Sequence, residues 1–269
     1  MTTAAGKSPN KAKKMGIQKK HMILSVISTV WFAFLGFIVI FPVFAGLMAS
    51  FRPGRELIRR GLAINLDFKS MTLNNYKYLF SWNADSKKYF MWFKNSMILT
   101  LVTVVLTLLI CYLVAYGISM YDFKLRSVIL FLVIATMQMI DIKLINTTAG
   151  VILPGLCSAS TIFFFRQYMI GLPKELMDAG RIDGATEYGI CFKIILPITK
   201  PAFASMAILS TMGAWNNMLW PMLVFRDAKK FTLPIGLNTL LTPYGNNYDL
   251  LIAGSMFAII PIFVVFLCF

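Results

Sequence analysis

Long stretches of uncharged, mostly apolar residues recur along this chain. Five of them reach or approach the length of a membrane-crossing helix, which needs about 20 residues to cover about 30 Å of hydrocarbon. A sixth stretch, residues 127–140, is apolar but short. We therefore predict an all-α integral membrane protein with about six transmembrane helices, near residues 22–50, 95–120, 124–140, 147–166, 201–225 and 250–269.

The polar segments between these stretches give the predicted organisation. Residues 1–21 form a basic tail and residues 22–269 a single transmembrane domain. The tail has six lysines and no acidic residue, which favours a cytoplasmic N-terminus. We then expect residues 52–94 to be extracellular and residues 171–197 to be cytoplasmic, between the fourth and fifth spans.

Composition supports a membrane protein and argues against a nucleic-acid partner. The chain is 58% hydrophobic and 14% charged, so lipid must be its main solvent. Its net charge of +15 comes from residues in the tail and the connecting segments, which suits a membrane surface. The first apolar run is about twice as long as the 7–15 residues of a signal peptide, which argues against a cleaved leader.

The long apolar runs contain no Asp, Glu, Lys, Arg or His, and the single histidine, His21, lies at the edge of the first run. Ion-coupled transporters commonly carry ionisable residues inside the bilayer. An ion-coupled carrier that uses backbone carbonyls stays an alternative. The pattern favours a transporter whose energy enters from outside its spans.

No catalytic residue or metal ligand set is predicted. The four cysteines are widely spaced and form neither a disulfide framework nor a zinc site. Gly6-Lys7-Ser8 resembles the end of a phosphate-binding loop, but the required earlier glycine would fall on Met1. An intramembrane enzyme is therefore the least favoured class, and any nucleotide is expected to bind to another chain.

The segment 171–197 begins with a short surface helix of about ten residues. Pro173 suits its first turn, Glu175 lies at the positive end of the helix dipole, and Gly184 suits a left-handed stop. A narrow apolar stripe runs along one side, formed by Leu172, Leu176, Ala179 and either Ile182 or Asp183.

Acidic residues are concentrated in the same segment. Four of the eleven acids of the chain fall within thirteen residues: Glu175, Asp178, Asp183 and Glu187. A helix lying on anionic lipid would prefer Lys and Arg, so docking to a protein is favoured. Gly180 costs about 1 kcal/mol inside a helix and permits close approach at a tight interface.

Asp178-Ala179-Gly180, then Gly184 and Ile194-Ile195-Leu196-Pro197, follow one another at a recognisable spacing. They resemble the EAA motif of binding-protein-dependent ABC importer permeases, with Asp-Ala-Gly in place of Glu-Ala-Ala. The stretch from Ile182 to Ala185 is similar to the carbohydrate class, the maltose-type permeases. Other short matches recur in the family's order: Thr72 to Tyr76, Asn95-Ser96, Ala115-Tyr116, Ile152 to Gly155 and Trp215-Asn216.

The resemblance implies that residues 174–185 form a coupling helix in a cleft of a cytoplasmic ATPase. The residues implied in that contact are Glu175, Asp178, Ala179, Gly180, Asp183, Gly184 and Ala185. Two ATPase subunits would hold ATP and Mg, with no cofactor on this chain. A second permease subunit, expected to form a heterodimer, and an extracellular solute-binding protein would complete the importer in a bacterial cell membrane. The implied substrate is an oligosaccharide; another small solute is the alternative.

Aromatic and amide side chains in the fifth span are the candidates for substrate contact. Sugars offer C–H faces to indole rings and hydroxyls to amides, but Trp can instead be an interfacial anchor and Asn can join helices. Packing is the default for two tyrosines four residues apart. The candidates are Trp215, Asn216, Asn217 and Trp220, with Tyr112 and Tyr116 as weaker ones.

The third span is too short for a typical crossing. The fourteen residues 127–140 give a helix of about 21 Å against about 30 Å of hydrocarbon. We expect Ile140 and Asp141 to flank further residues in the natural protein, and further residues to follow Phe269.

Overall fold

The computed structural model describes residues 9–54, 71–121, 144–240 and 247–269, and these residues form helices joined by loops, without a strand. The predicted all-α class is confirmed. The chain divides into two compact units, residues 1–72 and 73–269. The predicted third span, with Ile140 and Asp141, lies outside the described residues.

The first unit contains one long helix, α1 (Pro9–Ser50), which begins within the predicted basic tail. Its stretch Leu24–Ser50 is long and apolar enough to cross a membrane. Large hydrophobic side chains from Met22 to Leu47 are exposed around it. Such a helix, apolar on all sides, suits a lipid environment.

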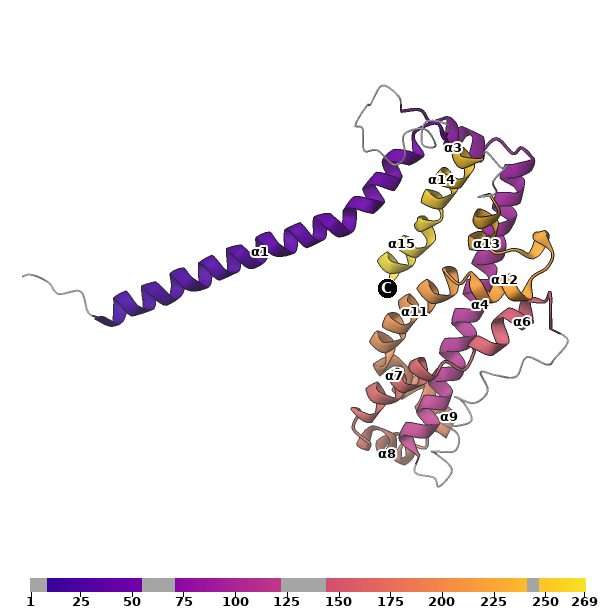
Figure 1. The fold of residues 1–269 in the computed structure, drawn as a ribbon. Helices are drawn as coiled ribbons and strands as arrows, with labels where there is room; N and C mark the ends of the chain where they lie inside the picture. Colours follow the sequence, from indigo (N-terminus) through magenta and orange to yellow (C-terminus); the bar gives the residue numbers. More distant parts are fainter. Residues whose placement is uncertain (1–8, 55–70, 122–143, 241–246) are drawn as a thin grey trace, which may run out of the picture. The chain divides into compact units, whose positions relative to one another are not determined.

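The second unit is built around α4 (Ala84–Met120), whose 37 residues give a length of about 55 Å. The helix begins eleven residues before the predicted span because Asn83 caps it, accepting a hydrogen bond from the Ser86 backbone N–H at 2.8 Å. One end of α4 lies beside α3 (Asn74–Leu79) and the other beside α8 (Glu175–Ile182) (Figure 1). These are called the α3 end and the α8 end below.

The predicted span 147–166 is a broken helix. It consists of α6 (Thr148–Ile152), the 3-10 turn η3 (Leu153–Gly155) and α7 (Ala159–Ile170), bent by 42°. Pro154 cannot donate a backbone hydrogen bond, and Ser158 starts a new helix by accepting from the Thr161 N–H at 3.3 Å. The break therefore has a local cause in the sequence.

The predicted span 201–225 is also two helices, α11 (Lys200–Trp215) and α12 (Leu219–Val224). The first ends where Asn216 donates its backbone N–H to Met212 and its side-chain amide to the same carbonyl. In the region of the last predicted span, α14 (Tyr248–Phe257) and α15 (Ile259–Cys268) together form one 21-residue stretch that is long and apolar enough to cross a membrane. The remaining helical pieces are α9 (Glu187–Gly189), η4 (Ile190–Ile195), α10 (Leu196–Ile198), η5 (Ala228–Lys230) and α13 (Leu233–Thr239).

At the α3 end, polar side chains of α4 hold the loop that precedes α13. Trp92 donates its indole N–H to the Ala228 carbonyl at 3.1 Å, and Asn95 donates to the carbonyls of Lys229 and Phe231 at 2.8 and 3.0 Å. The Ser96 hydroxyl accepts from the Leu233 N–H at 2.7 Å. These contacts fix the loop against the helix.

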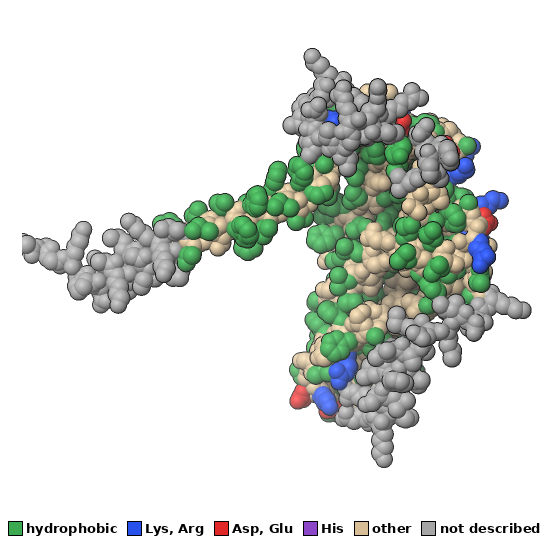
Figure 2. Space-filling model, viewed as in Figure 1, with side chains coloured by type: hydrophobic (Ala, Val, Ile, Leu, Met, Phe, Trp, Pro, Cys, Tyr) green, Lys and Arg blue, Asp and Glu red, His purple; other side chains and the backbone are tan. Residues whose placement is uncertain are grey.

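Charge and apolar surface are separated on the second unit. Figure 2 shows Lys, Arg, Asp and Glu side chains near α8, near α3 and around the 226–230 loop, with hydrophobic side chains over much of the surface between. Arg226, Asp227, Lys229 and Lys230 are exposed in that loop. This distribution suits a membrane-embedded body with polar surfaces outside the hydrocarbon.

Candidate functional site

Helix α8 (Glu175–Ile182) forms the predicted surface helix, eight residues long. Gly184 has φ of +78°, which confirms the predicted left-handed stop. Its N–H donates to the Arg181 carbonyl at 3.0 Å, and the Ala185 N–H donates to the Gly180 carbonyl at 2.9 Å. These two bonds form a Schellman motif, which satisfies carbonyls at the helix end.

The inward face of α8 differs from the predicted apolar stripe. Met177 and Gly180 are buried, whereas Ala179 is exposed and Ile182 is 86% exposed. A Cβ added at Gly180 would lie 2.8 Å from Ile194 Cδ1. The close approach expected of Gly180 is therefore made within this chain, against the segment that follows α8.

The outward face of α8 combines acidic and apolar side chains. Among the seven residues implied in ATPase contact, Gly180 is buried and Ala185 is half-buried. The other five are exposed: Glu175, Asp178, Ala179, Asp183 and Gly184. Tyr188, which the sequence did not single out, is 79% exposed close by in the chain. Acidic and apolar side chains are thus exposed together on this face.

Arg181 connects α8 to the end of α4, a role that the sequence analysis missed. Its guanidinium contacts Asp178 at 3.2 Å and Glu187 at 2.8 Å, and the Tyr121 hydroxyl donates to the other Glu187 oxygen. The Arg181 and Tyr121 hydrogen bonds hold the pKa of Glu187 below its usual value. Tyr121 directly follows α4, so this network joins the surface helix to the central helix.

The segment after α8 contains a π-helical stretch, Ile190–Ile195, packed on that helix. The Cys191 carbonyl accepts from the Leu196 N–H and from the Tyr112 hydroxyl, the latter at 2.9 Å. Tyr112 is fully buried, and its ring lies 6.4 Å from the ring of Tyr116, which is also buried. Both tyrosines thus lie in the packed core at the α8 end of α4. π-Helical turns are frequent at functional sites.

Tyr112→Phe should destabilise this junction without changing its shape. The substitution removes one buried hydrogen bond, worth about 0.5–1.5 kcal/mol. The Cys191 carbonyl keeps the Leu196 N–H as a donor, so the loss should lie toward the lower part of that range. We expect the thermal unfolding midpoint of the purified complex to fall by about 2–4 °C. The exposed Tyr188→Phe is the control, and an equal shift in both variants would contradict the role given to Tyr112.

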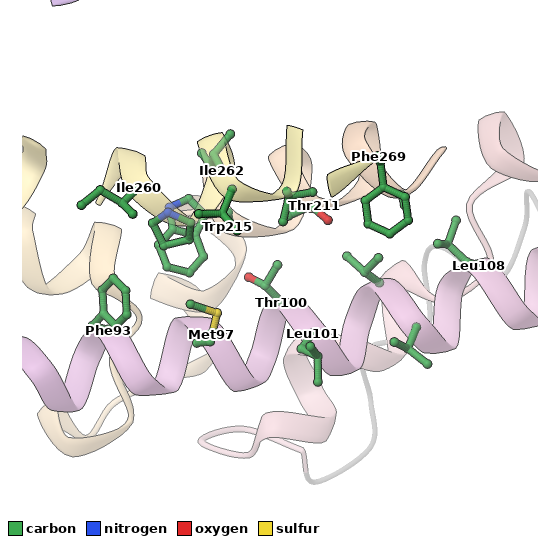
Figure 3. A pocket seen from close by; sticks show the side chains of 16 residues that line it. Phe93, Met97, Thr100, Leu101, Leu108, Thr211, Trp215, Ile260, Ile262 and Phe269 are labelled. Atoms are coloured by element: carbon green, nitrogen blue, oxygen red, sulfur yellow. The ribbon is translucent and has the colours of Figure 1, made fainter. Parts of the chain in front are cut away.

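The four substrate candidates of the fifth predicted span divide between two cavities and the surface. Trp215 is 4% exposed, packs edge-on against Phe93 with centroids 5.6 Å apart, and lines a cavity of about 500 Å³ between α4, α11 and α15. Figure 3 shows its indole among apolar side chains, with Thr100 and Thr211 contributing hydroxyls. This cavity, called the apolar cavity below, offers a sugar few polar partners.

Asn217 and Trp220 line a different and smaller cavity of about 270 Å³. It is lined by residues of α4, α6, η3 and the α11–α12 region: Leu99, Thr103, Val151, Pro154, Gly155, Ala214, Asn217 and Trp220. The Trp220 indole N–H donates to the Gly150 carbonyl at 3.1 Å. Asn216 is exposed and donates its side-chain amide to the Met212 carbonyl of its own helix, so it does not line this cavity. This space is called the mixed cavity below.

The helical architecture, the hydrophobic surface between the charged regions and the attached surface helix α8 are those of a multispan membrane protein of the transporter permease class. The chain belongs to the family of binding-protein-dependent transport system inner membrane components, whose model matches residues 97–269. It is a transport permease subunit of the ABC importer type rather than an enzyme.

Among curated relatives, the chain is 48% identical over 265 residues, 94% of each chain, to the arabinooligosaccharides transport system permease protein AraQ of Halalkalibacterium halodurans. It is 45% identical over 260 residues, 92% of each chain, to AraQ of Bacillus subtilis. A solved bacterial ABC transporter involved in import of the acidic polysaccharide alginate matches with a TM-score of 0.74. That match covers 98% of this chain and 97% of the other at 20% identity, which shows a shared fold.

Proposed function

We propose that this chain and a second, different permease subunit form the translocation pathway for an oligosaccharide in an ATP-driven importer. Arabinooligosaccharides are the first candidates, because the two AraQ relatives match over more than nine-tenths of their length. The observation that carries the ATP-driven mechanism is the exposed, acidic helix α8, attached to α4 through Arg181, Glu187 and Tyr121.

In this proposal, α8 sits in a cleft of a cytoplasmic ATPase subunit. Two ATPases bind ATP and Mg, and their closure moves α8. The movement passes to α4 by two routes. One is the Arg181–Glu187–Tyr121 network, and the other runs from Gly180 to the π-helical stretch 190–195, whose Cys191 carbonyl accepts from Tyr112 of α4. A rigid link of this kind suits a subunit whose long apolar runs carry no ionisable side chain, since energy must enter at its surface.

The proposed orientation puts the N-terminus and the α8 end in the cytoplasm of a bacterial cell. The acid-free lysine-rich tail supports this orientation. The α3 end would then face outward, where a solute-binding protein delivers the substrate. The exposed residues Arg226, Asp227, Lys229 and Lys230 lie in a loop held to that end of α4.

Reconstitution tests the proposed function. The chain is expressed with its partner permease, ATPases and binding protein, purified as a complex and placed in proteoliposomes loaded with ATP. Labelled arabinooligosaccharide should accumulate only with ATP and binding protein present. Accumulation of another solute class instead would overturn the sugar assignment, and uptake driven by an ion gradient without ATPase would overturn the coupling mechanism.

Asp178→Lys should reduce uptake while the subunit remains in the membrane. The change reverses a charge on the proposed ATPase surface and removes the 3.2 Å contact with Arg181. Because an exposed pair contributes about 0–1 kcal/mol to stability, folding should be nearly unchanged. Uptake and ATP hydrolysis are measured with Lys87→Glu, an exposed charge reversal near the α3 end, as the control. Equal uptake by both variants and the unmodified complex would argue against docking through α8.

A further inference from the structure

We propose that the mixed cavity is a subsite for one sugar ring of the transported oligosaccharide. This inference rests on the proposed function and adds the residues and the part of the substrate that meet. Thr103, Asn217 and Trp220 line this cavity and are the residues proposed to contact the sugar. Trp215 and Asn216 do not line it.

The cavity lies at the depth where a transported molecule must pass. Thr103 is close to the middle of α4, which extends from Ala84 to Met120, so it is separated from both ends by more than 20 Å of helix. Asn217 follows the end of α11, and Pro154 and Gly155 form the turn η3. Residues from two interrupted apolar runs therefore meet one uninterrupted helix at this point.

These interruptions are informative because the backbone groups freed by them cannot face hydrocarbon. Irregular backbone at membrane depth is tolerated only where it is buried in protein or lines a water-filled cavity. Both breaks, after Gly155 and after Trp215, lie next to residues that line the mixed cavity. The breaks thus place the Asn217 amide and irregular backbone beside a cavity whose lining is part polar and part apolar, where they can contact a hydrated solute.

The side chains offer the chemistry that recognises a sugar. Asn217 supplies an amide with both donors and an acceptor, and it is exposed. The Thr103 hydroxyl oxygen is buried without a hydrogen-bond partner among the described residues, a costly state that a ligand hydroxyl or water would relieve after rotation about χ1. Trp220 adds an aromatic surface and is anchored to the Gly150 carbonyl.

The volume and polarity of the mixed cavity fit a single sugar ring. A volume of about 270 Å³ lies below the range of about 300–1,000 Å³ typical of pockets that enclose whole drug-sized ligands. It therefore suits one ring while the rest of the chain extends beyond it. The apolar cavity is larger, but its lining of hydrocarbon side chains around Trp215 would leave sugar hydroxyls without partners.

The test uses the complete reconstituted importer and two nearly shape-preserving variants, Thr103→Val and Asn217→Leu. Thr107→Val is the matched control, since Thr107 lies four residues further along α4, is buried and has an unpartnered hydroxyl, but lines neither cavity. Uptake is measured with di-, tri- and tetrasaccharides of arabinose, alongside ATP hydrolysis stimulated by the loaded binding protein.

Each cavity variant should lower the uptake rate by about fivefold or more, the effect of losing a hydrogen bond in the pathway. Stimulated ATP hydrolysis should stay close to that of the unmodified complex. The loss should be the same for all three chain lengths, because one ring occupies the subsite. Unchanged uptake in both cavity variants, or an equal loss in Thr107→Val, would overturn the subsite and leave the proposed function standing. No sugar uptake by the unmodified complex would overturn both.

Discussion

Gly184→Val is expected to reduce transport by about tenfold or more. Gly184 has φ of +78°, a conformation that a β-branched residue adopts at a cost of about 1–3 kcal/mol. No atom lies within 4 Å of the position that a Cβ would take, so the cost comes from the backbone rather than from a collision. Relieving it would break the bonds that Gly184 and Ala185 donate to the end of α8. A change of 1.4 kcal/mol in docking is tenfold in an equilibrium constant.

Gly184→Asn separates backbone strain from bulk, because Asn tolerates the left-handed region far better than Val. Uptake by the reconstituted complex should therefore decline in the order Gly, Asn, Val, with membrane levels of the subunit measured in parallel. Equal defects in Asn and Val would indicate that any side chain here blocks the ATPase contact. Normal uptake by Gly184→Val would show that the end of α8 has no part in coupling.

The ends of α8 could be predicted from sequence, but its inward face could not. A glycine stop is a local signal, since it depends on the backbone of one residue and two hydrogen bonds within the same turn. The buried face depends on what lies opposite. Gly180 packs against Ile190 and Ile194 of the π-helical stretch 190–195, and no local pattern in the sequence indicated that stretch.

The hydrophobic pattern predicted apolar stretches but not the helix breaks that the described residues show within two of them. An uncharged run of about 20 residues satisfies the length rule whether it forms one helix or two. Pro154-Gly155 and Asn216-Asn217 were the available signals, since Pro and Gly interrupt helices and Asn can bond to nearby backbone. Treating these positions as helix breaks would have predicted that each of the two runs forms more than one helix. It would also have suggested that Gly155 and Asn217 lie at related places in the fold.

The network around Arg181 shows that the acidic residues of the segment 171–197 do not form a single docking surface, because Glu187 is bonded within this chain. Asp178 and Arg181 are three residues apart on a helix, so their pairing was predictable. The contact of Arg181 with Glu187 spans the turn after α8, and Tyr121 comes from more than 60 residues earlier in the chain. One of the four acids is thus engaged in holding α8 to α4, which sequence spacing alone could not establish.

Gly236→Ala should destabilise the α3 end of the protein strongly. A Cβ at Gly236 of α13 would lie 2.2 Å from two ring atoms of Trp92. The indole cannot move away easily, because it is 5% exposed and its N–H is bonded to the Ala228 carbonyl. The helix α13 is held in turn by the bond from the Leu233 N–H to Ser96. Overpacking typically costs about 1–3 kcal/mol, and a collision with a fixed ring should fall at or above the upper end.

The yield and thermal unfolding midpoint of the purified complex measure this effect. Gly213→Ala in α11 is the matched control, since no atom lies within 4 Å of its added Cβ and Ala favours a helix by about 0.5–1 kcal/mol. Its midpoint should stay the same or rise, whereas that of Gly236→Ala should fall by several degrees. Adding Trp92→Leu should recover part of the loss, because the two residues are coupled by direct contact. An unchanged midpoint for Gly236→Ala would mean that α13 and Trp92 are not held in this close packing, and that the polar contacts at the α3 end permit movement.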